Sequence, residues 1–264
     1  MEDTPLKCVA RYDGTNFAGW QRQTGMRTVQ GVLEETLSRI ARREIAIQGA
    51  GRTDAGVHAL GQVFSCRWPD EPPQRLGYAV SKMTGPEIRI ESVLRAPPTF
   101  NARFDALGKR YVYTFDFNRR PDPFSARYAW HVPYALDLEL FEKSLRAIRG
   151  IHDFAGFQSA GNQMKHTVRT IHAARLYEGG LYHAPDANGL FRVELVGDGF
   201  LYKMVRNICG TLVEIARGRF AADTMQAMLR LGGPFRGHCA PAHGLALAEV
   251  YYDACDFDVA CSSP

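Results

Sequence analysis

Apolar and polar residues alternate along the chain with two periods, which predict a series of strands and helices. A period of two predicts strands over roughly residues 6–12, 88–94, 109–117, 191–195 and 246–252. Apolar residues three or four apart predict helices over roughly 29–40, 74–83, 138–148, 200–215 and 225–231. Thr28 and Asp137 precede two of these helices as N-cap residues. The outer face of the first helix is expected to carry Glu34, Glu35, Arg39, Arg42 and Arg43.

Strand–helix–strand order in both halves predicts an α+β protein with two halves, residues 1–105 and 106–253, and a frayed tail at 254–264. Met1-Glu2-Asp3 lacks the basic start of a signal peptide, and no apolar run is long enough for a membrane span. The six cysteines form no CxxC pair. We therefore expect a cytoplasmic protein with free thiols and no membrane contact.

Charge is nearly balanced overall but unevenly distributed. Lys and Arg number 32 against 28 Asp and Glu, and the pI is about 8.7. Residues 101–175 contain twelve Lys or Arg and seven Asp or Glu, and residues 201–219 contain four against one. These segments fit either a phosphate-binding surface or an ordinary solvated basic face.

Residues 49–59 form a polar, glycine-rich loop, and Asp54 is the only acid in it. The apolar alternation at Ile45 and Ile47 before the loop and over 63–66 after it predicts a strand on each side. Three glycines suit a backbone with positive φ or a close approach to another segment. The third glycine of a dinucleotide fingerprint and the Gly-Lys-Ser/Thr of a P-loop are both missing. Two alternatives stay open for Asp54: a structural turn and a catalytic acid.

Arg206 lies off the apolar stripe of the helix predicted from residue 200. A cation in the first turns of a helix is disfavoured by the helix dipole, so its natural partner is a carboxylate. His238, Cys239 and His243 suggest zinc, but their spacing is irregular and a fourth ligand is missing. Tyr111 lies near the start of a strand whose aromatic residues are typical of a core.

Gly51-Arg52-Thr53-Asp54-Ala55-Gly56-Val57-His58-Ala59 resembles the signature of the tRNA pseudouridine synthase A family, and residues 11–23, 200–207 and 240–245 resemble other family motifs. The resemblance implies two ferredoxin-like halves that share a central antiparallel sheet, with a cleft between them. It also implies that Asp54 is the nucleophile, that Tyr111 stacks on the target uracil, and that Arg206 pairs with Asp54. Arg52, beside Asp54, is a candidate to fill the vacated space or grip a phosphate.

The sequence departs from the family pattern at two places. Ser81–Glu87 replaces the usual Asn followed by Leu-Pro, and Cys239 replaces the usual Thr. By resemblance the chain is a homodimer that isomerises uridines 38, 39 and 40 in the anticodon arm of tRNA, without a cofactor. Two rivals stay open: a non-catalytic tRNA-binding protein of this fold, and a metal hydrolase built on Asp54, His58 and His243.

Overall fold

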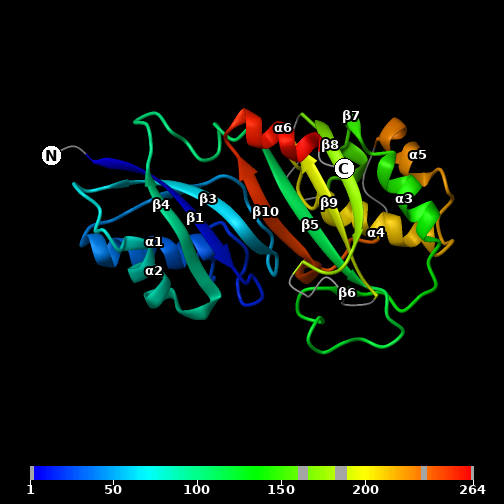
Figure 1. Cartoon of the computed structure of the whole chain (residues 1–264), viewed down its shortest axis with the longest axis horizontal. Helices are drawn as coiled ribbons and strands as arrows, with labels where there is room; N and C mark the ends of the chain where they lie inside the picture. Colours follow the sequence, from blue (N-terminus) through cyan, green and yellow to red (C-terminus); the bar gives the residue numbers. More distant parts are fainter. Residues whose placement is uncertain (1–2, 160–165, 182–188, 233–236, 263–264) are drawn as a thin grey trace. The chain divides into compact units, whose positions relative to one another are not determined.

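The computed structural model describes residues 3–159, 166–181, 189–232 and 237–262, which form two compact units (Figure 1). Residues 1–107 and 246–252 make the first unit, and residues 108–245 and 253–264 make the second. The sequence had suggested a division after residue 105, with the last strand in the second half. That strand instead pairs Ala246 with His58 of the first unit, a non-local parallel contact that periodicity does not reveal.

The sheet of the first unit is mainly antiparallel. Its strands are β1 (Thr4–Tyr12), β2 (Ile47–Gly49), β3 (His58–Trp68), β4 (Ile88–Arg95) and β10 (Leu245–Tyr251). The order is β4-β1-β3-β10, and β2 also pairs with β3. β1 is antiparallel to both β3 and β4, whereas β10 is parallel to β3. β1 is therefore paired along both edges, which makes it a central strand of this unit.

Helices α1 (Val29–Ala41) and α2 (Leu76–Thr84) complete the first unit, and a 3-10 turn (Gly85–Glu87) leads from α2 into β4. Thr28 caps α1 as predicted, because its Oγ1 accepts a hydrogen bond from the Gly31 N–H at 3.2 Å. The expected outer face is wrong at Glu34, whose side chain is buried and accepts a hydrogen bond from the Ile47 N–H. A buried acid is tolerated there because its oxygens are hydrogen-bonded.

The second unit also has an antiparallel sheet with order β5-β9-β8-β7, and β6 is parallel to β5. Its described strands are β5 (Gly108–Asp116), β6 (Trp130–His131), β7 (Gly150–Asp153), β8 (Val168–Glu178) and β9 (Leu190–Gly197). Its described helices are α3 (Leu138–Arg146), α4 (Met204–Ala216), α5 (Thr224–Leu231) and α6 (Ala254–Ser262), with 3-10 turns at Ala155–Phe157 and Ala242–Gly244. Asp137 caps α3 as predicted, accepting from the Leu140 N–H at 2.9 Å.

Helix α4 begins later than expected from its apolar stripe. It starts at Met204 rather than near Phe200, because Lys203 has a left-handed backbone with φ 58° that interrupts the helix. Every residue of α4 is buried except Arg206. The helix therefore runs through the core of this unit and leaves one side chain at its first turn in partial contact with solvent.

Residues 254–262 form α6 instead of a frayed tail. Asp253 Oδ1 accepts hydrogen bonds from the backbone N–H groups of Cys255 and Asp256, which caps the start of the helix. At the other end, the Arg175 guanidinium donates to the carbonyls of Ala260 and Cys261. None of the helices in the described ranges has the length and apolar character needed to cross a membrane.

Candidate active site

The Asp54 loop, residues 50–57, connects β2 to β3, and its backbone N–H groups bond to β3 and to a carbonyl within the loop. Ala50 N–H donates to the Val63 carbonyl at 2.7 Å, and Val57 N–H donates to the Asp54 carbonyl at 3.1 Å. Gly56 has φ +77°, a conformation that side-chain-bearing residues rarely adopt. The sequence places glycine where this turn requires it, so the loop closes within a few residues.

A second loop, residues 13–28 between β1 and α1, packs directly against the Asp54 loop. The Trp20 N–H donates to the Thr53 carbonyl at 3.0 Å, and the Gly56 N–H donates to the Phe17 carbonyl at 3.3 Å. A Cβ added to Gly19 would lie 2.7 Å from the Thr53 carbonyl oxygen, inside van der Waals contact. Glycine is thus required at position 19 for the two backbones to approach.

Buried polar side chains hold the Asp54 loop from inside the unit. The hydroxyls of Tyr12 and Thr53 lie 2.8 Å apart, and Gln62 Nε2 donates to the Gly51 carbonyl at 2.8 Å. Burial raises the pKa of Tyr12 to about 12, despite its hydrogen bonds to Thr53 and Gln62, so this phenol is neutral near pH 7. The candidate acid therefore stands on a loop fixed by neutral hydrogen bonds.

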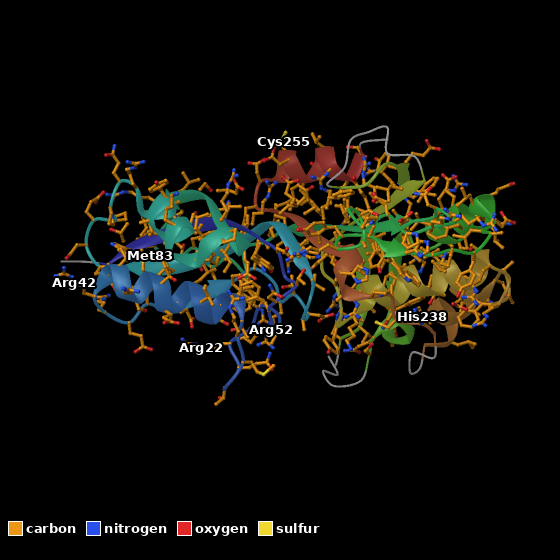
Figure 2. The ribbon with its side chains drawn as sticks, turned by 90° about the horizontal axis from the view of Figure 1, so that it is seen from below. Arg22, Arg42, Arg52, Met83, His238 and Cys255 are labelled. Carbon is orange, nitrogen blue, oxygen red and sulfur yellow. The ribbon has the colours of Figure 1, made fainter. Side chains whose placement is uncertain are left out.

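The two predicted site residues in this loop differ in exposure. Asp54 is partly exposed, whereas Arg52 is exposed and lies on the surface of the first unit (Figure 2). Solvent therefore reaches both side chains, as a site for a macromolecular substrate requires.

His58 does not fit the role of a metal ligand. Its side chain is buried, and Nδ1 accepts a hydrogen bond from the Gly14 N–H at 3.1 Å while lying 3.2 Å from Asp13 Oδ1. In the described ranges, no three His, Cys, Asp or Glu side chains gather as a metal-binding group. This geometry supports a structural role for His58 beneath the Asp54 loop.

Tyr111 lies in β5 of the second unit. Its side chain is 7% exposed, and its ring contacts that of Phe200 edge to face, with centroids 4.9 Å apart. Both faces of β5 are buried from Tyr111 to Asp116. Tyr111 is therefore more enclosed than its position near the strand start indicated, and Phe200 is the aromatic neighbour that sequence reasoning missed.

Arg206, in the first turn of α4, is positioned by a reciprocal pair of hydrogen bonds. Its Nε donates to the Ala240 carbonyl at 2.8 Å, and the Ala240 N–H donates to the Arg206 carbonyl at 3.1 Å. The approach depends on Gly210, where an added Cβ would lie 1.7 Å from the His238 carbonyl oxygen. Lys203, just before the helix, has a strained left-handed backbone, a feature that concentrates at functional sites.

The residues considered for zinc make other contacts. His238 stacks on Trp130 with centroids 5.3 Å apart, and His243 Nε2 lies 3.2 Å from the Ala129 carbonyl oxygen. Burial lowers the pKa of His243, and the nearby Arg206 guanidinium lowers it further, against the opposing effect of the Ala129 hydrogen bond. His243 is therefore a neutral, half-buried neighbour of Arg206 at pH 7.

Asp54 and Arg52 thus belong to the first unit, and Tyr111 and Arg206 belong to the second. Sequence reasoning missed Gln30 and placed Glu34 on the outer face of α1, whereas the Gln30 Nε2 donates a hydrogen bond to Glu34 Oε1 at 2.9 Å. Their four-residue spacing on a helix is the one available signal, because it places them on the same side of α1.

The model of a family described as tRNA pseudouridine synthase matches residues 8–105 and 145–253, ranges that include Asp54 and Arg206 and leave out Tyr111. Proteins named tRNA pseudouridine synthase A are similar over nearly the whole chain. The one from Streptococcus mutans serotype c is 38% identical over 94% of this chain and 98% of its own. The one from Geobacillus sp. is 39% identical over the same shares.

A solved structure, the archaeal box H/ACA sRNP Nop10-Cbf5 complex, gives a TM-score of 0.34 at 11% identity, covering 80% of this chain and 43% of that one. That similarity is too low to guide interpretation. The full-length relatives carry the assignment, and with it the α+β pseudouridine synthase fold predicted from the sequence. The chain belongs to the tRNA pseudouridine synthase A family, an isomerase family.

Proposed function

We propose that this protein isomerises uridine to pseudouridine at positions 38, 39 and 40 of the tRNA anticodon stem-loop, with Asp54 as the nucleophile. The observation that carries the proposal is the way in which the protein holds Asp54. It is the only acid of a glycine-rich loop whose backbone is fixed on two sides, and the residue is partly exposed. It also lies within the range matched by the family model.

The reaction explains why an acid is needed. The bond between the ribose C1′ and uracil N1 breaks, the base turns, and C5 bonds to C1′. C5 then loses its proton and N1 takes one up, so the product is an isomer of the substrate. An ionised carboxylate can hold the detached fragment covalently between these steps. The isomerisation involves no net oxidation, reduction or transferred donor group, so the proposal includes no cofactor.

The other predicted residues have distinct roles in this proposal. Arg206 pairs with Asp54 in the bound enzyme and favours its ionised form. Tyr111 stacks on the uracil and keeps it in the site while it turns. A uridine within a stem must leave its stack, at a cost of a few kcal/mol, and the exposed Arg52 fills the vacated space or grips the neighbouring phosphate.

The substrate and the assembly are also part of the proposal. The surplus of Lys and Arg in residues 101–175 and 201–219 supplies phosphate contacts, so affinity for tRNA should fall as salt rises. We propose a cytoplasmic homodimer in which two subunits share one tRNA.

The decisive experiment is to map pseudouridine in a tRNA transcript after incubation with the purified protein. Transcripts with cytidine at position 38, 39 or 40 should each lose modification at that position alone. Binding without modification would identify a non-catalytic tRNA-binding protein, and modification elsewhere would overturn the assigned positions. Full turnover in the presence of a chelator is expected, whereas loss of activity would favour the metal-dependent rival.

A further inference from the structure

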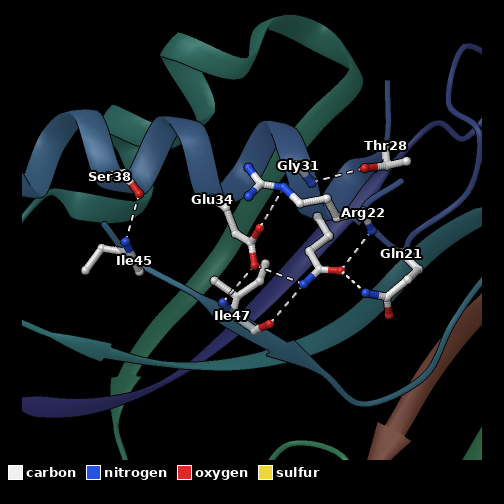
Figure 3. Close-up of polar contacts among 9 residues, drawn as sticks. Gln21, Arg22, Thr28, Gly31, Glu34, Ser38, Ile45 and Ile47 are labelled. Carbon is white, nitrogen blue, oxygen red and sulfur yellow. Dashed lines mark hydrogen bonds and ion pairs between the residues drawn. The ribbon is translucent and has the colours of Figure 1, made fainter. Parts of the chain in front are cut away.

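We infer that Gln30 is a positioning residue for catalysis. Its side chain attaches residues 19–22, which pack against the Asp54 loop, to helix α1 and strand β2 of the first unit. Gln30 lies in the first turn of α1, 24 residues before Asp54 in the sequence. Its side chain hydrogen-bonds to Gln21, Arg22, Glu34 and Ile47, the four partners labelled in Figure 3. This role rests on the proposed nucleophilic function of Asp54.

All the hydrogen-bonding capacity of the Gln30 amide is used. Its Oε1 accepts from Gln21 Nε2 at 2.8 Å and from the Arg22 N–H at 3.0 Å. Its Nε2 donates to Glu34 Oε1 at 2.9 Å and to the Ile47 carbonyl at 3.2 Å. One side chain therefore joins the loop after β1, helix α1 and strand β2 (Figure 3).

The backbone of Gln30 adds a fifth connection. Its N–H donates to the Trp20 carbonyl at 3.0 Å, while the Trp20 N–H donates to the Thr53 carbonyl at 3.0 Å. Through these two hydrogen bonds, Trp20 connects helix α1 to Thr53, the residue immediately before Asp54. The fit is tight, because a Cβ on Gly49 would lie 2.5 Å from Trp20 Nε1.

Glu34 contacts the same loop and also strand β2. Its Oε1 also accepts from the Ile47 N–H at 3.1 Å, and its Oε2 lies 3.2 Å from Arg22 Nε. The side chain of Glu34 is 9% exposed, whereas that of Arg22 is 58% exposed. The acid is thus the fixed partner, and the loop residue is held against it.

The physical consequence concerns catalysis more than binding. A displacement of about 1 Å at a reacting group can lower a rate about 100-fold. Apart from the Gln30 side chain, residues 19–22 are attached to α1 by two backbone hydrogen bonds, from the Val29 N–H to the Gly19 carbonyl at 3.1 Å and from the Gln30 N–H to the Trp20 carbonyl at 3.0 Å, and by the exposed Arg22 in its ion pair with Glu34. Releasing Gln30 should let the Asp54 loop shift while the exposed surface that meets RNA stays in place.

Ser38 offers a matched control on the same helix. Its Oγ accepts a hydrogen bond from the Ile45 N–H at 2.8 Å, and Figure 3 shows this bond apart from those at Gln21 and Arg22. Ser38→Ala removes one hydrogen bond between α1 and the segment entering β2. A purely structural role for the region predicts similar effects of Ser38→Ala and Gln30→Met at equal loss of stability.

The test measures single-turnover pseudouridine formation at saturating tRNA, the Kd for tRNA, and amide hydrogen exchange over residues 50–58. We expect Gln30→Met to lower the rate about 10- to 100-fold, to change Kd less than about threefold, and to speed exchange in the Asp54 loop. Ser38→Ala should keep the wild-type rate and exchange. If Gln30→Met does not fold, Gln30→Glu keeps the oxygen facing Gln21 and replaces the donor facing Glu34, with the same expected direction.

A wild-type rate for the Gln30 variants, or an effect confined to Kd, would overturn the inference. So would equal rate losses in Gln30→Met and Ser38→Ala. These outcomes differ from failure of the proposed function itself, in which Asp54→Asn would retain the wild-type rate. If Asp54→Asn is inactive and Gln30→Met is fully active, only the positioning role falls.

Discussion

The loop around Asp54 and the first turn of α4 around Arg206 position their charged residues in different ways. The Asp54 loop is held through backbone groups, with Trp20 and Phe17 bonded to its peptide units and Gly19 pressed against it. Arg206 is held through its own guanidinium, whose Nε bonds to the Ala240 carbonyl.

The difference predicts where each site is vulnerable. A backbone-held loop should tolerate replacement of its exposed side chain structurally and fail when a supporting glycine gains a Cβ. A side chain held through its own guanidinium should be sensitive to the geometry of that donor group. The following experiments test this contrast, from the largest expected effect to the smallest.

Asp54→Asn should abolish turnover, by about 10⁴-fold or more, as loss of a nucleophile does in other enzymes. Because the loop is held by backbone bonds, the variant should keep its melting temperature and its affinity for tRNA. Single-turnover assays, thermal unfolding and tRNA binding measure the three quantities. A large fall in the melting temperature of Asp54→Asn would show that the Asp54 side chain itself stabilises the loop.

Arg206→Ala should lower the rate about 100- to 1000-fold, the usual effect of removing one group that stabilises charge in a site. Arg206→Lys should recover little, because an ammonium lacks the planar set of donors that serves Ala240 and a carboxylate together. Arg219→Ala is the matched control, since this arginine lies just after α4 and is 67% exposed. Equal losses in the two alanine variants would mean that only net charge matters.

Tyr111→Leu should weaken tRNA binding about 5- to 150-fold, because stacking on a base contributes about 1–3 kcal/mol. Tyr111→Phe should bind nearly as well as wild type, since it keeps the ring and its edge-to-face contact with Phe200. Equilibrium binding at fixed salt measures both. Identical affinities for the two variants would remove stacking as the role of this ring.

Gly19→Ala should lower the rate about tenfold through displacement of the Asp54 loop. Gly19 has φ +92° and no room for a Cβ, whereas Gly25 has φ +73° with nothing within 4 Å. Gly25→Ala therefore pays only the conformational cost of a left-handed residue, about 1–2 kcal/mol, and should keep the wild-type rate. Comparable rate losses in Gly19→Ala and Gly25→Ala would argue that the backbone contact between Gly19 and the Asp54 loop does not position Asp54.

His243 should give the smallest effect, a pH dependence of stability. Its pKa in the folded protein lies below the usual value of 6.5, so the unfolded chain takes up the proton first as pH falls. The free energy of unfolding should therefore decline as pH drops through about 6.5. His243→Gln should lack this part of the slope in urea unfolding from pH 5 to 8, and an unchanged slope would contradict the assignment.

Much of this protein could be predicted from local sequence patterns. Thr28 and Asp137 act as the helix caps predicted for them, because a cap bonds to backbone amides within three residues. The strands and helices follow apolar periodicity for the same local reason. Residues 51–59 were enough to indicate the family, which the full-length relatives confirm.

The tertiary structure decided what depends on distant partners. Glu34 is buried because Ile47 and Arg22 satisfy its oxygens, and the final strand joins the first unit because it pairs with His58 and Ala59. Periodicity describes each segment by itself, so it predicted the helices α1 to α5 and strands such as β1, β4 and β5, but it did not predict β7 or α6. Which segments become neighbours, and which polar groups can therefore be buried, is set only when the folded chain brings their hydrogen-bonding partners together.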